Sequence, residues 1–231
     1  VQTALGDGGA RKLKDWVRDG GTLICIGGAA DWATDSAAGL SSVRLKREAL
    51  DELAEYDADN AYELFQARPA VDTNQVWNYK KPESAEAAKT GGAPDKATLK
   101  REDERARSLF QPRGVVFNVM LDNERWPAFG CQTRVAAGLY TSSAYMSKSP
   151  VETIGRIEDA ENARLSGLLW PEARERWANT AYLTREGSGK GQIILFAGDP
   201  DFRGYWKGTA RLFNNILALG PGFGTNVSVG W

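Results

Sequence analysis

The start of the chain combines two apolar patterns of different period. Leu13, Trp16 and Val17 recur at helical spacing among basic residues, which predicts an amphipathic helix from Ala10 to Asp19. A Gly-Gly pair ends this pattern, and the next segment, Thr22–Ile26, is apolar at nearly every position. A run of this length is typical of a strand covered on both faces in a parallel sheet. We therefore expect a helix, a turn and a buried strand of an α/β fold.

The pattern changes between residues 41 and 110. Apolar residues at helical spacing from Val43 to Arg68 predict a helix, which Pro69 stops. The stretch from Tyr79 to Arg107 has mixed charges and few large apolar side chains, and TGGAP interrupts it. We predict that residues 41–110 form a charged helical insertion within a single domain that spans residues 1–231.

Strand patterns return after the insertion. Residues 115–121, VVFNVML, alternate in the manner of a strand, and residues 133–140 predict another. The segment from 141 to 164 is expected to be a loop or a short helix. It leads to residues 165–170, LSGLLW, and Pro171 then begins a helical turn.

The last third of the chain predicts a hairpin followed by a helix. Residues 180–184 and 192–196 are apolar and flank GSGKG, so they should pair as an antiparallel hairpin. GSGKG lacks the Walker spacing and lies between two strands, which indicates a turn and not a phosphate loop. A final helix is expected from Thr209 to Leu219, ending at Gly220-Pro221.

Composition excludes several classes of function. The 231 residues are 42% hydrophobic, which is enough for a real core, and 29 basic against 30 acidic residues leave a net charge of −1. This balance provides no broad positive field for nucleic acid or anionic lipid, and no apolar run approaches the roughly 20 residues that span a bilayer. The chain contains no histidine, so its own residues cannot form Ser-His or Cys-His pairs or histidine-containing zinc sites.

The two cysteines, Cys25 and Cys131, do not have metal-type spacing and are too few for a disulfide framework. Cys25 lies inside an apolar run and has no histidine to activate it, so we expect a buried, inert thiol. We expect an equally ordinary role for Cys131. No catalytic residue, metal ligand or cofactor is predicted for this chain.

Three stretches carry a resemblance to a known domain. They are LKDWVRDGGTLICIGGAA near the start, WPAFG in the middle and GKGQIILFAGDPDFRGYWKGTARLFNNILALGP near the end. Together they resemble the C-terminal domain that follows the catalytic domain in bacterial secreted zinc-carboxypeptidase-like proteins. That domain is similar in fold to class I glutamine amidotransferases. Where the pattern has a His-Pro pair, this chain has Trp126-Pro127.

The resemblance implies an amidotransferase-like (flavodoxin-like) three-layer sandwich that ends in an antiparallel hairpin. It also implies a secreted or periplasmic protein whose catalytic domain belongs to a preceding segment. Folds of this kind place early strands beside the strand at Thr22–Ile26. We therefore expect the strand ending at Phe196 on one edge of it, and an upstream catalytic domain or another polypeptide segment on the other, completing the sheet.

One segment is a weak candidate for ligand binding. Asp199, Asp201, Arg203 and Trp206 follow a strand at its expected carboxyl end, where open α/β sheets place ligand crevices. The structural alternative is that Asp199 caps a turn and Arg203 forms an ion pair. Three functions stay open: a non-catalytic accessory domain, a small-molecule or glycan-binding module that uses this crevice, and a carboxylate-based hydrolase.

Overall fold

The computed structural model describes residues 2–49 and 111–223. The chain divides into two compact units, Val1–Lys46 with Arg107–Trp231, and Arg47–Ala106. The helix predicted from Val43 to Arg68 and the predicted insertion 41–110 lie largely outside the described residues. Within them, Arg44–Leu45 forms a short strand, β2, and Lys46–Ala49 forms a short helix, α3.

The first unit is an α/β structure with a mixed sheet, nine-stranded over the described residues. Its main path runs β1-β9-β8-β6-β3-β4, with β2 beside β5, β5 also beside β8, and β7 beside β3. The pair β1–β9 is parallel, and the other described pairs are antiparallel. Besides β2, the strands are β1 (Thr22–Ile26), β3 (Val115–Leu121), β4 (Arg134–Leu139), β5 (Tyr145–Met146), β6 (Glu152–Ile157), β7 (Arg164–Ser166), β8 (Ala181–Ser188) and β9 (Gly191–Phe196).

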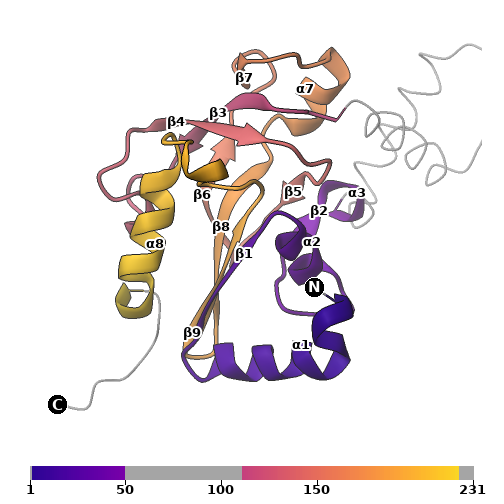
Figure 1. The fold of residues 1–231 in the computed structure, drawn as a ribbon, viewed down its shortest axis with the longest axis vertical. Helices are drawn as coiled ribbons and strands as arrows, with labels where there is room; N and C mark the ends of the chain where they lie inside the picture. Colours follow the sequence, from indigo (N-terminus) through magenta and orange to yellow (C-terminus); the bar gives the residue numbers. More distant parts are fainter. Residues whose placement is uncertain (1, 50–110, 224–231) are drawn as a thin grey trace, which may run out of the picture. The chain divides into compact units, whose positions relative to one another are not determined.

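Helices lie on both sides of the β1–β9 end of the sheet. Figure 1 shows α8 on one side of these strands and α1 and α2 on the other. Phe213 of α8 meets Phe196 of β9 edge-to-face, with ring centroids 6.2 Å apart. Besides α3, the helices are α1 (Gln2–Arg18), α2 (Gly28–Thr34), α7 (Pro171–Trp177) and α8 (Ala210–Phe223), with single 3₁₀ turns η3 (Trp126–Ala128) and η4 (Phe202–Gly204).

The predicted hairpin is confirmed as β8 and β9, which are joined by Gly189-Lys190. Gly189 has a φ of +63°, which a glycine adopts without strain. Gly191, the first residue of β9, packs against the end of α1, which leaves no room for a side chain. A Cβ there would stand 2.1 Å from the Val17 carbonyl oxygen and 2.2 Å from that of Gly21. Gly189 and Gly191 therefore allow the hairpin turn to pack closely against the end of α1.

Other predicted elements are confirmed as well. Strand β3 buries every second residue, as its alternation predicts, and β4 lies beside it. The strand that ends at Phe196 is the parallel neighbour of β1, as expected. The helical turn that Pro171 begins is α7.

The segment from 141 to 164 was expected to lack strands, and this prediction is wrong. It contains β5 and the whole of the central strand β6. Gly155 in the middle of β6 weakens the strand signal. Glycine fits a tightly packed position here, since a Cβ at Gly155 would stand 3.2–3.3 Å from side-chain atoms of Val119, Leu121 and Leu183.

Two helix boundaries and one helix face also differ from the predictions. Helix α1 begins at Gln2, and α8 continues through Gly220-Pro221. The Gly220 carbonyl accepts a hydrogen bond from the Gln192 side chain at 2.9 Å, and this tertiary contact holds the last turn. Trp16 was expected to face the core but is 50% exposed, with its ring over Gly21.

Candidate functional site

The predicted crevice residues follow the carboxyl end of β9, as expected, and share one loop. Asp199 is exposed, and its Oδ1 accepts a hydrogen bond from the backbone N–H of Asp201 at 3.0 Å. This is the local turn that aspartate forms with the backbone two residues on. The Asp199 carboxylate therefore contributes to the shape of the loop.

Aromatic contacts dominate the rest of this loop. The indole N–H of Trp206 donates to the Ala136 carbonyl at 3.1 Å, which ties the loop to β4. Phe202 stacks on Tyr140 with ring centroids 4.8 Å apart. The Arg203 guanidinium lies 5.2 Å from the Phe202 ring centre, and within residues 2–49 and 111–223 it forms no ion pair.

Cys25 lies in the core, 3% exposed, at the end of β1 that leads to α2. Burial raises the pKa of this thiol to about 11, so it is protonated near neutral pH. Tyr145 of β5 donates a hydrogen bond to Asp31 of α2 close by, and burial raises the pKa of that phenol as well. This environment disfavours a thiolate nucleophile.

Cys131 lies in a different setting, half-buried after η3. Burial raises the pKa of its thiol, and the positive charge of Arg211 opposes that shift. In the described parts of the chain, no group of three Cys, Asp or Glu side chains is placed to hold a metal ion.

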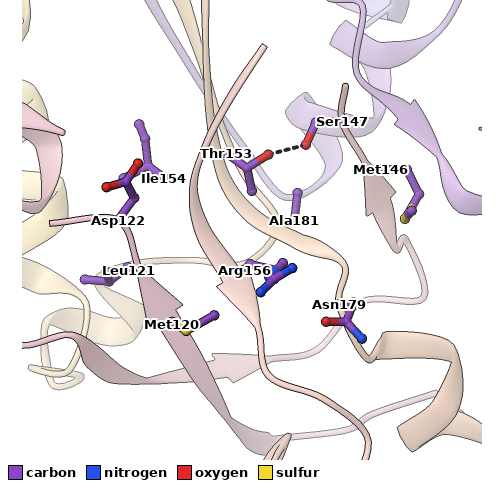
Figure 2. A pocket seen from close by; sticks show the side chains of 10 residues that line it. All are labelled: Met120, Leu121, Asp122, Met146, Ser147, Thr153, Ile154, Arg156, Asn179 and Ala181. Atoms are coloured by element: carbon purple, nitrogen blue, oxygen red, sulfur yellow. Dashed lines mark hydrogen bonds between the residues drawn. The ribbon is translucent and has the colours of Figure 1, made fainter. Parts of the chain in front are cut away.

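A cleft of about 440 Å³ opens over the middle of the sheet, away from the predicted loop. Register places Met120 of β3, Arg156 of β6 and Ala181 of β8 in one row across the sheet. Met146 and Ser147 come from β5 and the residue after it (Figure 2). The lining residues are scattered from 120 to 181, so no compact motif in the sequence marks this cleft.

Some polar side chains of the cleft have hydrogen-bond partners within the protein, and others do not. The Ser147 and Thr153 hydroxyls bond to each other at 2.5 Å. The Asp122 carboxylate accepts from the Glu124 N–H and from Arg125, at 3.1 and 3.3 Å. By contrast, the described residues provide no hydrogen bond or ion pair to the Arg156 guanidinium.

The backbone of β1 is paired along one edge. The Gly27 N–H donates to the Phe196 carbonyl of β9 at 3.1 Å. Alternate residues of a strand present their backbone groups to the same edge, so the odd-numbered residues of β1 face β9. The opposite edge carries the backbone groups of Thr22, Ile24 and Ile26, and no other described strand pairs with it.

No protein-family model matches the sequence, and no curated protein or solved structure is significantly similar to it. None of the described helices is long and apolar enough to cross a membrane.

Proposed function

We propose that the chain is a non-catalytic accessory domain that receives a strand from another polypeptide segment along the outer edge of β1. The observation that carries this proposal is the unpaired outer edge of β1 among the described strands. Its sequence is that of an interior strand, but among the described strands it has one neighbour, β9. An apolar strand with a free edge is a ready template for pairing with another segment.

Side-chain burial supports the same proposal. In β1, Leu23, Ile24 and Ile26 are only partly buried, although they pack against the core. A strand added at this edge would bury more of these side chains, at about 25 cal/mol for each Å² of apolar surface removed from water. It would also pair the backbone groups that now point outward.

The larger protein in this proposal is a secreted or periplasmic zinc-carboxypeptidase-like polypeptide, with an amidotransferase-like fold for the present domain. Support for that fold comes from the parallel pair β1–β9 with helices on both sides and from the hairpin of β8 and β9. The absence of histidine from the sequence agrees with a role outside the peptidase chemistry.

A second candidate function is glycan binding at the loop from Asp199 to Trp206. Tyr205 is 82% exposed next to the stacked pair Tyr140–Phe202, and exposed aromatic rings are the surfaces on which sugar rings stack. A carboxylate-based hydrolase lacks comparable support, since the Asp199 carboxylate is engaged by the Asp201 N–H.

The proposal is tested on the native polypeptide. We expect its intact mass and amino-terminal sequence to include a segment beyond this chain, and we expect stoichiometric zinc and carboxypeptidase activity in that longer polypeptide. The isolated chain should neither retain stoichiometric zinc nor hydrolyse peptides with free C-termini, because it lacks imidazole ligands. One equivalent of tetrahedral zinc in the isolated chain would overturn the proposal.

A Tyr205→Ala variant examines the glycan alternative separately. If glycans bind at the loop, a panel of oligosaccharides should bind the intact chain in a saturable manner and lose affinity on this substitution. Tyr205 is exposed, so the variant should keep its fold.

A further inference from the structure

We infer that the cleft over β3, β6 and β8 binds a small organic carboxylate with a short apolar chain, which Arg156 recognises. The volume of about 440 Å³ falls within the roughly 300–1,000 Å³ of small-molecule pockets. This inference does not depend on the proposed pairing at β1, because no residue of β1 lines the cleft.

The charge of the ligand follows from the Arg156 guanidinium. Its side chain is exposed to the cleft, and it has no hydrogen bond or ion pair within the described parts of the chain. Arginine presents its N–H donors in a planar fork that matches the two oxygens of a carboxylate. Asp122 is the acidic residue of the lining, and Arg125 lies 3.3 Å from it, which offsets its charge.

Asn179 supplies a second polar group near the same position. Figure 2 shows Arg156 between Asp122 on one side and Asn179 on the other. The backbone of Asn179 has a φ of +60°, and its N–H is held by the carbonyls of Ile157 and Glu158 at 3.2 and 3.3 Å. Asn179 is exposed, and no protein partner for its side-chain amide is present in residues 2–49 and 111–223, so the amide is available to donate to a bound carboxylate.

The apolar part of the ligand follows from the remaining lining. Met120 lies beside Arg156 on β3, Ala181 lies on its other side on β8, and Met146 and Ile154 complete the walls. Methionine side chains adapt to ligands of different shape. A guanidinium beside such a surface suits a carboxylate that carries a few methylene groups better than inorganic anions.

The test uses hexanoate as the probe and amide NMR spectra of the full chain as the readout. Hexanoate should produce saturable shifts at Arg156 and Asn179, and acetate should bind more weakly because it lacks the apolar chain. Arg156→Gln should weaken hexanoate binding about tenfold or more, since a charge-assisted pair is lost. Arg156→Lys should give an intermediate affinity, because it keeps the charge without the fork.

Arg113→Gln is the matched control. Arg113 is exposed and precedes the opposite end of β3, so this variant should bind hexanoate as the unmodified chain does. The inference is overturned if hexanoate gives no saturable shifts, if Arg156→Gln binds it with unchanged affinity, or if hexan-1-ol binds as tightly as hexanoate. Circular dichroism checks that each variant keeps the fold.

Discussion

Strands β1 and β9 lie side by side in parallel and have similar apolar sequences, TLICI and GQIILF, but they differ in burial. All six residues of β9 are buried, whereas in β1 only Cys25 is. Helix α8 lies on one side of this strand pair and α1 and α2 on the other, but β9 has a neighbouring strand on each edge and β1 has one among the described strands. Position in the sheet, and not local sequence, decides how completely an apolar strand is covered.

The surroundings of β9 add to this contrast. Gln192 is completely buried, and its side chain accepts from Arg185 at 2.7 Å and donates to the Gly220 carbonyl at 2.9 Å. Arg185 also bonds Glu152 at 2.9 Å, so hydrogen bonds link β6, β8, β9 and α8. Strand β9 is the centre of this end of the fold, and β1 is its boundary.

The largest effect is expected from truncating β9 at its centre. Ile194 is fully buried, so Ile194→Ala should lower the free energy of unfolding by about 3–4 kcal/mol, from lost burial and the cavity left behind. Urea denaturation of the variant measures this loss. A loss below about 1 kcal/mol would contradict the central place of β9 in the core.

The contact between the hairpin and α1 gives the next effect. Gly191→Ala would place a Cβ against the carbonyl oxygens of Val17 and Gly21, so we expect a loss of about 2–3 kcal/mol in unfolding free energy. Gly187→Ala, in the same hairpin, is the control, because a Cβ there meets nothing within 4 Å. Equal stability of the two variants in urea denaturation would argue against the close packing.

A smaller effect is expected in β1. Ile24 is the register partner of Ile194 but is only partly buried, so Ile24→Ala should cost about 1–2 kcal/mol in unfolding free energy of the isolated chain. The comparison of the two isoleucines uses the same urea denaturation. If Ile24→Ala costs as much as Ile194→Ala, the outer strand is as fully covered as the inner one.

The smallest effect is expected for Cys25→Ala, about 1 kcal/mol at neutral pH, because a small buried thiol acts as a modest hydrophobe. Its pKa is raised from 9.0 to about 11 by burial, so between these values the unfolded chain releases a proton that the folded chain retains. Stability should therefore fall as the pH rises from 9 towards 11. The variant should lose less, although Tyr145 and Tyr182, whose pKa values burial also raises, still contribute. Thermal unfolding at several pH values measures this difference. If the variant loses as much stability between pH 9 and 11 as the unmodified chain, the thiol is not buried as described.

Much of the sheet follows from local patterns in the sequence. A few neighbouring residues are enough to predict three of its parts: β3 from its alternation, the turn between β8 and β9 from its glycines, and β1 from its apolar run. Strand β6 was missed because Gly155 weakens the local strand signal, and its tight packing against β3 and β8 involves residues that are distant in sequence. The end of α8 was misplaced for the same reason, since Gln192 holds Gly220.

The candidate sites divide in the same way. The loop from Asp199 to Trp206 was found because a strand end followed by polar residues is a contiguous signal. The cleft around Arg156 was missed because its lining comes from four strands and the segments between them, and register brings these residues together. The pattern of apolar and polar residues within a single strand does not show which residues of the other strands lie beside it.

Amide hydrogen exchange along β1 tests the central claim most directly. In the isolated chain, the N–H groups of Leu23, Cys25 and Gly27 face β9 and should exchange slowly, while those of the alternate residues Thr22, Ile24 and Ile26 should exchange quickly. In the native polypeptide, the second set should become as protected as the first, because an added strand accepts their hydrogen bonds. Slow exchange of all six amides in the dilute isolated chain, or fast exchange of the second set in the native polypeptide, would contradict the proposed pairing.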